Sequence, residues 1–221
     1  MLKLDNLSYS EKGKKLTFEY SYDTSLAKYF NKKELYYVYY QEDISSIPNS
    51  INTIPFLASV MPIAWFVGFD VYVDELDETF YNSLHELKKE FAIHFPQIKN
   101  DTKLHVKKLV ANTFDNDNYG LLFSGGLDAF ESLTRNIEKK PFLISIHGAD
   151  IEIKDEKRWN DFKTFNLEEE IIEEERVCYV ESNLRTFYTY EVDLLVGLGW
   201  WGKIQHGMAV LSWIAPLSYI H

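Results

Sequence analysis

The sequence predicts an α/β protein in which a doubly wound parallel sheet at residues 113–221 follows a smaller α+β region at residues 1–112. Two observations carry this prediction. Strand and helix patterns alternate regularly after residue 119, whereas they are mixed before it. Residues 111–119, ANTFDNDNY, are polar and rich in Asn and Asp, which is typical of a boundary. Strands that alternate with helices imply a parallel sheet with helices on both faces.

The first region has several strand patterns. Apolar and polar side chains alternate from Leu16 to Tyr22, after a turn at residues 11–14. Further runs with a strand period or with β-branched and aromatic composition are expected to be strands. They are residues 35–40, 69–73 and 104–110.

Two helices are expected in the same region. Residues 54–68 are almost wholly apolar, but they are shorter than the roughly 20 residues of a membrane-spanning helix and contain two prolines. We therefore expect a buried helix, preceded by a polar loop at residues 49–52. Asp77 is expected to cap a second, amphipathic helix that Pro96 ends.

The second region reads as strand, helix, strand, helix, strand, helix. The predicted strands are residues 120–123, 141–147 and 177–181, and the predicted helices are residues 128–136, 159–175 and 203–214. The last helix is apolar almost all round, so we expect it to need cover on most sides. If the chain supplies none, residues 208–217 form an exposed apolar patch that a partner or a second copy would cover.

The charge is concentrated in the second region. The whole chain has a net charge of −11; residues 111–221 hold 19 acidic and 10 basic side chains, a net charge of −9. Such a surface repels phosphodiester backbones, so nucleic acid is a poor candidate partner. The single cysteine, Cys178, excludes an internal disulfide and a multi-cysteine metal cluster. With no apolar stretch near Met1, a cytoplasmic protein without a membrane anchor is the expectation.

The segment that points to chemistry joins the strand at residues 120–123 to the helix after it. Ser124, Gly125, Gly126, Leu127 and Asp128 form this loop. Glycines let the backbone N–H groups approach an anion closely, and the helix dipole adds to that field. Ser124 can donate to a phosphate oxygen, and Asp128 can hold Mg²⁺. The alternative is an ordinary strand-to-helix turn with Asp128 as its cap.

Other candidate residues follow the later strands. His147, Gly148 and Asp150 lie where open α/β sheets bind ligands, or they form a tight turn with a solvated carboxylate. Arg185 could pair with a phosphate or a substrate carboxylate, or with a surface acid. His206 could act as an acid or base, or pack beside the neighbouring tryptophans.

The segment FSGGLDAFESL at residues 123–133 resembles the S-G-G-x-D-S motif of the PP-loop ATP pyrophosphatases. Residues 146–151, 181–185 and 205–207 are similar to relatives of the 7-cyano-7-deazaguanine synthases. The resemblance covers about residues 119–221 and implies a HUP-like doubly wound fold that binds ATP with Mg²⁺. It also implies that ATP adenylates a carboxylate or carbonyl oxygen of a small molecule, with release of pyrophosphate, before a nitrogen or sulfur nucleophile displaces AMP. Asp128, Arg185 and His206 would then be the catalytic residues.

Three departures from that family pattern leave two functions open. Ala129 stands where the motif has its second serine, the cysteines that bind zinc in the synthases are absent, and the sequence ends at His221, where relatives continue. We expect the sheet to be incomplete at that end. The leading hypothesis is an ATP-dependent ligase or synthase. The alternative is a weakened nucleotide-binding module within a multi-protein assembly.

Overall fold

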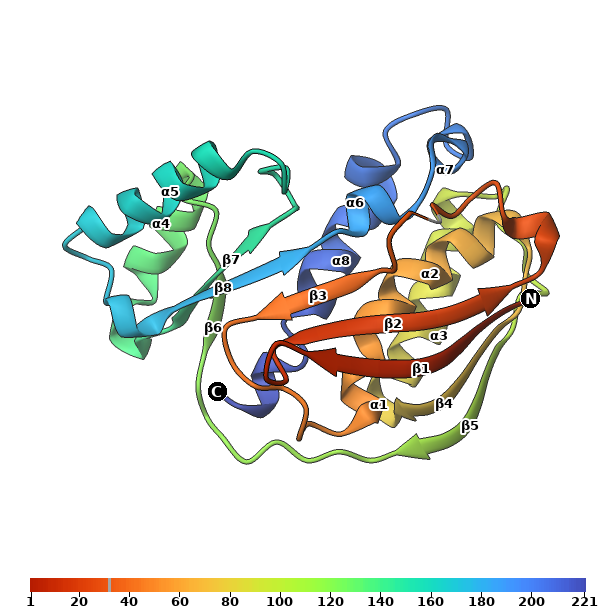
Figure 1. Ribbon diagram of the computed structural model, residues 1–221, viewed down its shortest axis with the longest axis horizontal. Coiled ribbons are helices and arrows are strands. Elements are labelled where there is room, and N and C mark those ends of the chain that lie inside the picture. The colour runs from red at the N-terminus through yellow and green to blue at the C-terminus, as the bar shows by residue number, and fades with distance from the viewer. Residues whose placement is uncertain (32) are drawn as a thin grey trace.

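A computed structural model describes residues 1–31 and 33–221 (Figure 1). Its centre is one eight-stranded mixed sheet, with the strand order β5-β4-β1-β2-β3-β8-β7-β6. The strands are β1 (Leu2–Ser10), β2 (Lys15–Tyr22), β3 (Tyr37–Tyr40), β4 (Val71–Asp77), β5 (Leu104–Val110), β6 (Gly120–Leu122), β7 (Phe142–His147) and β8 (Val177–Ser182). The predicted α/β class is confirmed.

The helices lie on both faces of the sheet. They are α1 (Asn49–Asn52), α2 (Ile54–Val67), α3 (Glu78–His94), α4 (Leu127–Arg135), α5 (Glu156–Glu168), α6 (Leu184–Phe187), α7 (Tyr190–Leu194) and α8 (His206–Trp213). Neighbouring residues of β7 show the two layers. Leu143 packs in a small cluster with α4 and α5, whereas Ile144 belongs to the main core, which contains α2 and α8.

Parallel pairs lie at both ends of the sheet. At one end β1 pairs with β4, and β4 with β5, in parallel. At the other end β6 pairs with β7, and β7 with β8, in parallel. β8 then meets β3 in antiparallel register, with Val38 opposite Ser182 and Tyr40 opposite Val180. Strands from residues 1–112 and 113–221 therefore share one sheet, and the main core contains side chains from both ranges.

The apolar segment in the first region is the buried helix that was expected. Asn49–Val67 has the length and composition of a membrane span, but 94% of its most apolar window is buried inside the protein. A core helix has the same features. Residues 49–52 continue this helical segment as α1 and are not the polar loop that was predicted.

Other differences are local. The strand β1 was not predicted, because a bulge between Leu4 and Asn6 breaks its alternation. α5 begins at Glu156, after the Asp155 carboxylate accepts a hydrogen bond from Arg158 N (3.2 Å), and ends at Glu168 rather than Glu175. The glutamates that follow would stand at like-charged helical spacings, which destabilise a helix.

The final helix is covered by the first region. α8 packs against α2, so that Ala209, Val210, Trp213 and Leu217 are buried. In the stretch 208–217 Leu211 is the exposed large side chain, at 60%. The expectation of a broad exposed patch over this stretch is wrong, because the cover comes from a segment some 150 residues earlier in the chain.

Candidate functional site

The loop at residues 124–126 leaves the end of β6 at a fixed position. Phe123 is buried, and its N–H donates to the carbonyl of Ile144 on β7 (2.8 Å). The Ser145 hydroxyl donates to the carbonyl of Phe123 (2.7 Å). Strand β7 therefore holds the residue before the loop from two sides, and the turn begins from a rigid base.

The two glycines of the loop differ in backbone conformation and in the space around them. Gly125 has a φ of +71°, and a Cβ there would lie 2.8 Å from Cε2 of Phe162 on α5. Gly126 has an extended backbone and caps α4, with its carbonyl accepting from the N–H groups of Ala129 (3.0 Å) and Phe130 (3.1 Å). A Cβ at Gly126 would meet only the Ser124 hydroxyl, at 3.5 Å. The predicted strand, loop and helix are thus present.

The first turn of α4 has the properties of an anion site. N–H groups at a helix start have no partner within the helix, and the dipole places positive charge there. Leu127 is 85% exposed, and Asp128 is also exposed in this turn. The turn is therefore open to a ligand from solvent.

A cavity of about 210 Å³ opens beside this loop, at the carboxyl ends of β6 and β7. Its walls come from the loop, the segment after β7, α5 and α8. They are Leu122, Phe123, Ser124, Ile144, Ser145, Ile146, Ala149, Asp150, Ile151, Trp159, Phe162, His206 and Val210. The lining is mostly apolar with a few polar groups, which is the usual character of a small-molecule site. Asp150 and His206 are the charged or chargeable side chains among these described residues.

Asp150 and His206 line this cavity, and Arg185 lies beside it. His206 Nε2 lies 3.9 Å from Asp150 Oδ1, and the His206 and Trp201 rings meet edge to face with their centroids 5.1 Å apart. Arg185 Nη1 donates to the carbonyl of Ala149 (2.9 Å), and its guanidinium lies over Trp201 at 5.3 Å. A π-helical turn, Trp201–Gln205, contains Trp201 and ends at His206. Such turns frequently occur at functional sites.

His147 and Gly148 lie outside the lining. The ring of His147 is buried, with Nδ1 at 2.9 Å from the Glu181 carboxylate and Nε2 at 3.2 Å from the carbonyl of Glu152. It also stacks on Trp159, with ring centroids 4.7 Å apart. Gly148 has a φ of +97°, and a Cβ there would lie 2.0 Å from the carbonyl oxygen of Ser182. His147 thus links the end of β7 to Glu181 on β8, and Gly148 lets the backbone after β7 pass close to Ser182 at the end of β8.

The structure thus brings Ser124, Asp150 and His206 to one cavity and sets Arg185 beside it. Gly125, Gly126, Leu127 and Asp128 lie next to the cavity along the chain but do not line it. Sequence reasoning missed the aromatic wall formed by Trp159 and Phe162. Their spacing of three on a predicted helix, with two aromatic side chains on one face, was the available signal.

No family model, curated protein or solved structure matches this chain. The evidence for the α/β fold and for the cavity beside the loop therefore comes from the structure alone.

Proposed function

We propose that this chain binds ATP with Mg²⁺, with the phosphates at residues 124–126 and the adenosine in the neighbouring cavity. The observation that carries the proposal is the junction of two features. An open, glycine-containing helix start adjoins an apolar cavity with an aromatic wall, at the carboxyl edge of parallel strands. Neither feature alone distinguishes a nucleotide from another anion.

Different residues would contact the phosphates, the base and the metal ion of the nucleotide. The Ser124 hydroxyl and the free N–H groups at the start of α4 would take the phosphate oxygens, with the helix dipole opposing their charge. Trp159 and Phe162 give the base a flat apolar wall, and Asp150 accepts from a hydroxyl at the mouth. Asp128, exposed in the first turn, would hold Mg²⁺.

The reaction that best fits this layout is adenylate transfer to a small molecule. Bound ATP supplies an activated α-phosphorus: an oxygen of the substrate forms a new P–O bond there while the bond to pyrophosphate breaks. Arg185 is bound to the carbonyl of Ala149 beside the cavity, where it would orient a carboxylate substrate by paired hydrogen bonds. His206 Nε2 lies 3.9 Å from Asp150 Oδ1, beyond hydrogen-bond distance, and His206 would move a proton at the acceptor.

A binding module without turnover is the second candidate, and Ala129 favours it. Its side chain packs against the small apolar cluster of Phe123, Leu133 and Leu143, and adds no donor to the loop. Ala129→Ser supplies a hydroxyl worth about 1 kcal/mol as a neutral hydrogen bond. We expect it to tighten ATP binding or raise turnover several-fold in the enzyme. A variant that performs like wild type would show that Ala129 is no defect.

Calorimetric titration with ATP and Mg²⁺ tests the nucleotide site. Gly126→Val is the informative variant, because Gly126 already has an extended backbone and open space around it, so the fold should persist. Its branched side chain would cover the N–H groups, and we expect at least about a tenfold loss of affinity, as for one lost charge-assisted hydrogen bond. Gly125→Val should also lose binding, but it clashes with Phe162 and needs a check of folding.

Equal ATP affinity in wild type and in Gly126→Val would contradict the proposed site. If binding holds, product analysis separates the two candidates. An adenylate-forming enzyme releases AMP and pyrophosphate in the presence of its acceptor, whereas a module returns ATP unchanged.

A further inference from the structure

A second cavity, of about 510 Å³, lies on the far part of the sheet between α3 and β5. Helix α2 forms its floor. The lining residues are Met61, Trp65, Tyr81, Leu84, His85, Lys88, Lys89, Ala92, Asn100, Thr102, Lys103, Leu104 and His105. In a chain with a net charge of −11, none of these described lining residues is acidic, whereas five are basic. The volume is within the usual range for small-molecule sites.

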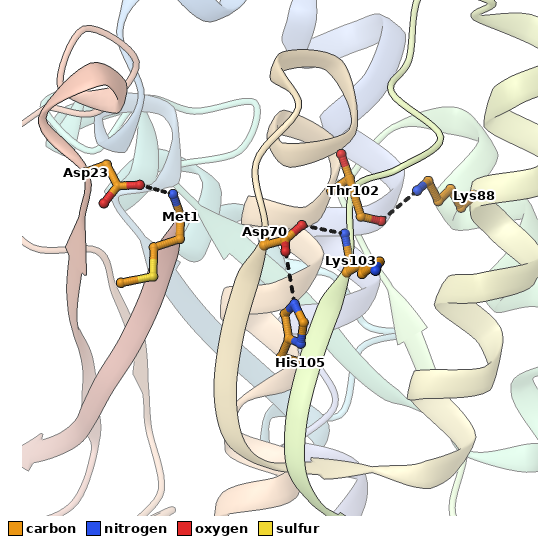
Figure 2. Close-up of polar contacts among 7 residues, drawn as sticks. All are labelled: Met1, Asp23, Asp70, Lys88, Thr102, Lys103 and His105. Carbon is orange, nitrogen blue, oxygen red and sulfur yellow. Dashed lines mark hydrogen bonds and ion pairs between the residues drawn. The ribbon is translucent and has the colours of Figure 1, made fainter.

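Lys88 crosses this cavity from α3 to the segment before β5. Its ammonium donates to the carbonyls of Asn100 (3.1 Å) and Thr102 (2.9 Å), and Figure 2 shows the second of these contacts. An ammonium has three protons to donate, so two carbonyls leave one. Among residues 1–31 and 33–221 no carboxylate oxygen lies within 4.0 Å of this ammonium. Partial burial lowers the pKa of Lys88.

Two nearby acids, Asp101 and then Asp70, oppose the effect of burial on the Lys88 pKa, and neither carboxylate lies within 4.0 Å of the Lys88 ammonium. Asp70 accepts from the backbone N–H of Lys103 (2.9 Å) and from His105 Nε2 (3.0 Å), as Figure 2 shows. Glu86 pairs with Lys89 on the surface, at 2.7 Å. Lys88 and Lys103 thus line the same cavity, and in the part of the chain that the structure describes no carboxylate oxygen lies within 4.0 Å of either ammonium group.

We propose that this cavity binds a small organic anion, a phosphate or carboxylate group carried on an apolar body. The anionic group would lie between Lys88 and Lys103, which approach from α3 and from the start of β5. The apolar body would cover Met61, Leu84 and Ala92, with Tyr81 and His85 beside it; the Tyr81 and His85 rings already contact each other edge to face at 4.5 Å. This site is independent of the proposed nucleotide site.

Titration calorimetry at low ionic strength with phenyl phosphate, benzoate and the neutral benzyl alcohol tests the proposal. We expect at least one anion to bind and the alcohol not to bind. The stronger anion identifies the head group. Lys88→Met and Lys103→Met should each lower the affinity for the anion by about tenfold, which is the effect of losing one charge-assisted hydrogen bond. Lys107→Met is the matched control, since Lys107 lies on β5 but pairs with Asp74 (2.7 Å) outside the lining.

Lys103→Met keeps the test decisive if Lys88→Met fails to fold, because the Lys103 backbone rather than its side chain makes the contact with Asp70. Gly126→Val should leave the affinity for these probes unchanged, which separates this site from the nucleotide site. The proposal is overturned if neither anion binds, if benzyl alcohol binds as well as the anions, or if Lys103→Met binds like wild type.

Discussion

At Gly148 the backbone passes so close to β8 that the residue type is fixed by two independent constraints. Its φ of +97° disfavours any side chain, and a Cβ would overlap the Ser182 carbonyl oxygen at 2.0 Å. The obstacle is backbone, so it cannot rotate away. We expect Gly148→Ala to lower the free energy of unfolding by more than about 2 kcal/mol, above the cost of a left-handed residue alone. Urea denaturation measures this.

Gly207 provides the control for that substitution. It lies within α8, and a Cβ there meets nothing within 4 Å. Gly207→Ala should be neutral or should stabilise by up to about 1 kcal/mol, the difference in helix propensity. Similar effects for the two substitutions would contradict the packing described around Gly148.

The thiol of Cys178 is predicted to be unreactive in the folded protein. Burial first, and then the negative charge of Glu42, raise its pKa to about 11. Since the thiolate is the reactive form, its fraction at pH 8 is about a thousandth, against roughly a quarter for an ordinary thiol. Reaction with Ellman's reagent at pH 8 should therefore be at least about a hundredfold slower than in urea. Rapid labelling of the native protein would contradict the burial of this side chain.

At the scale of elements, Pro62 leaves one carbonyl of α2 without its helical donor, and the side chain of Gln205 supplies a donor in its place. Proline has no N–H, so the carbonyl of Ala58, four residues earlier, lacks its helical donor. Gln205 Nε2 donates to that carbonyl (3.0 Å), and its Oε1 accepts from the Trp200 indole (3.3 Å). Ala58, Trp200 and Gln205 are all buried in the core. One side chain just before α8 thus satisfies a backbone group of α2.

Gln205→Leu should be costly, because it orphans both of these buried groups. At about 1–3 kcal/mol for each unsatisfied group, we expect a loss of about 2–6 kcal/mol in the free energy of unfolding. Pro62→Ala in that background restores an N–H opposite Ala58 and should recover part of the loss. A double-mutant cycle measured by urea denaturation gives the coupling energy. A coupling of zero would show that the two sites are independent.

Periodicity predicted most elements, and its failures have physical causes. The helix capped by Asp77 was predicted because its cap and its apolar stripe are both local; the carboxylate accepts from Phe80 N at 2.8 Å. β1 was missed because the bulge after Leu4 changes which residues face the core. The loop at residues 124–126 was located because strand, glycines and helix are contiguous in the chain.

The candidate cavity was only partly predictable. Ser124, Asp150 and His206 were singled out separately, but their meeting depends on α8 reaching the cavity that residues of β6 and β7 also line, which no local pattern encodes. His147 resembled a ligand-binding residue in the sequence. Its buried position follows from Glu181 and Trp159, whose placement beside it is a matter of tertiary structure.

On the scale of the whole molecule, we expect one unfolding transition. The β3–β8 ladder joins the two halves, and side-chain hydrogen bonds also cross between them. Among these, the Trp213 indole donates to the Tyr36 hydroxyl (2.7 Å), and the Tyr40 hydroxyl donates to the Trp213 carbonyl (3.0 Å). Calorimetric and van't Hoff enthalpies should then agree. Two separate transitions would instead support the division into domains at residues 1–112 and 113–221.

The contact between Gln205 and Ala58 also has a consequence for synthesis on the ribosome. The two residues are 147 positions apart. At a synthesis rate of about 5–20 residues per second, Gln205 is therefore added roughly 7 to 30 seconds after Ala58. During that interval an apolar helix with an unsatisfied carbonyl has no α8 to cover it. The nascent chain should therefore be a client of holdase chaperones until residue 205 leaves the exit tunnel, and slow codons between the two segments would lengthen its dependence on them.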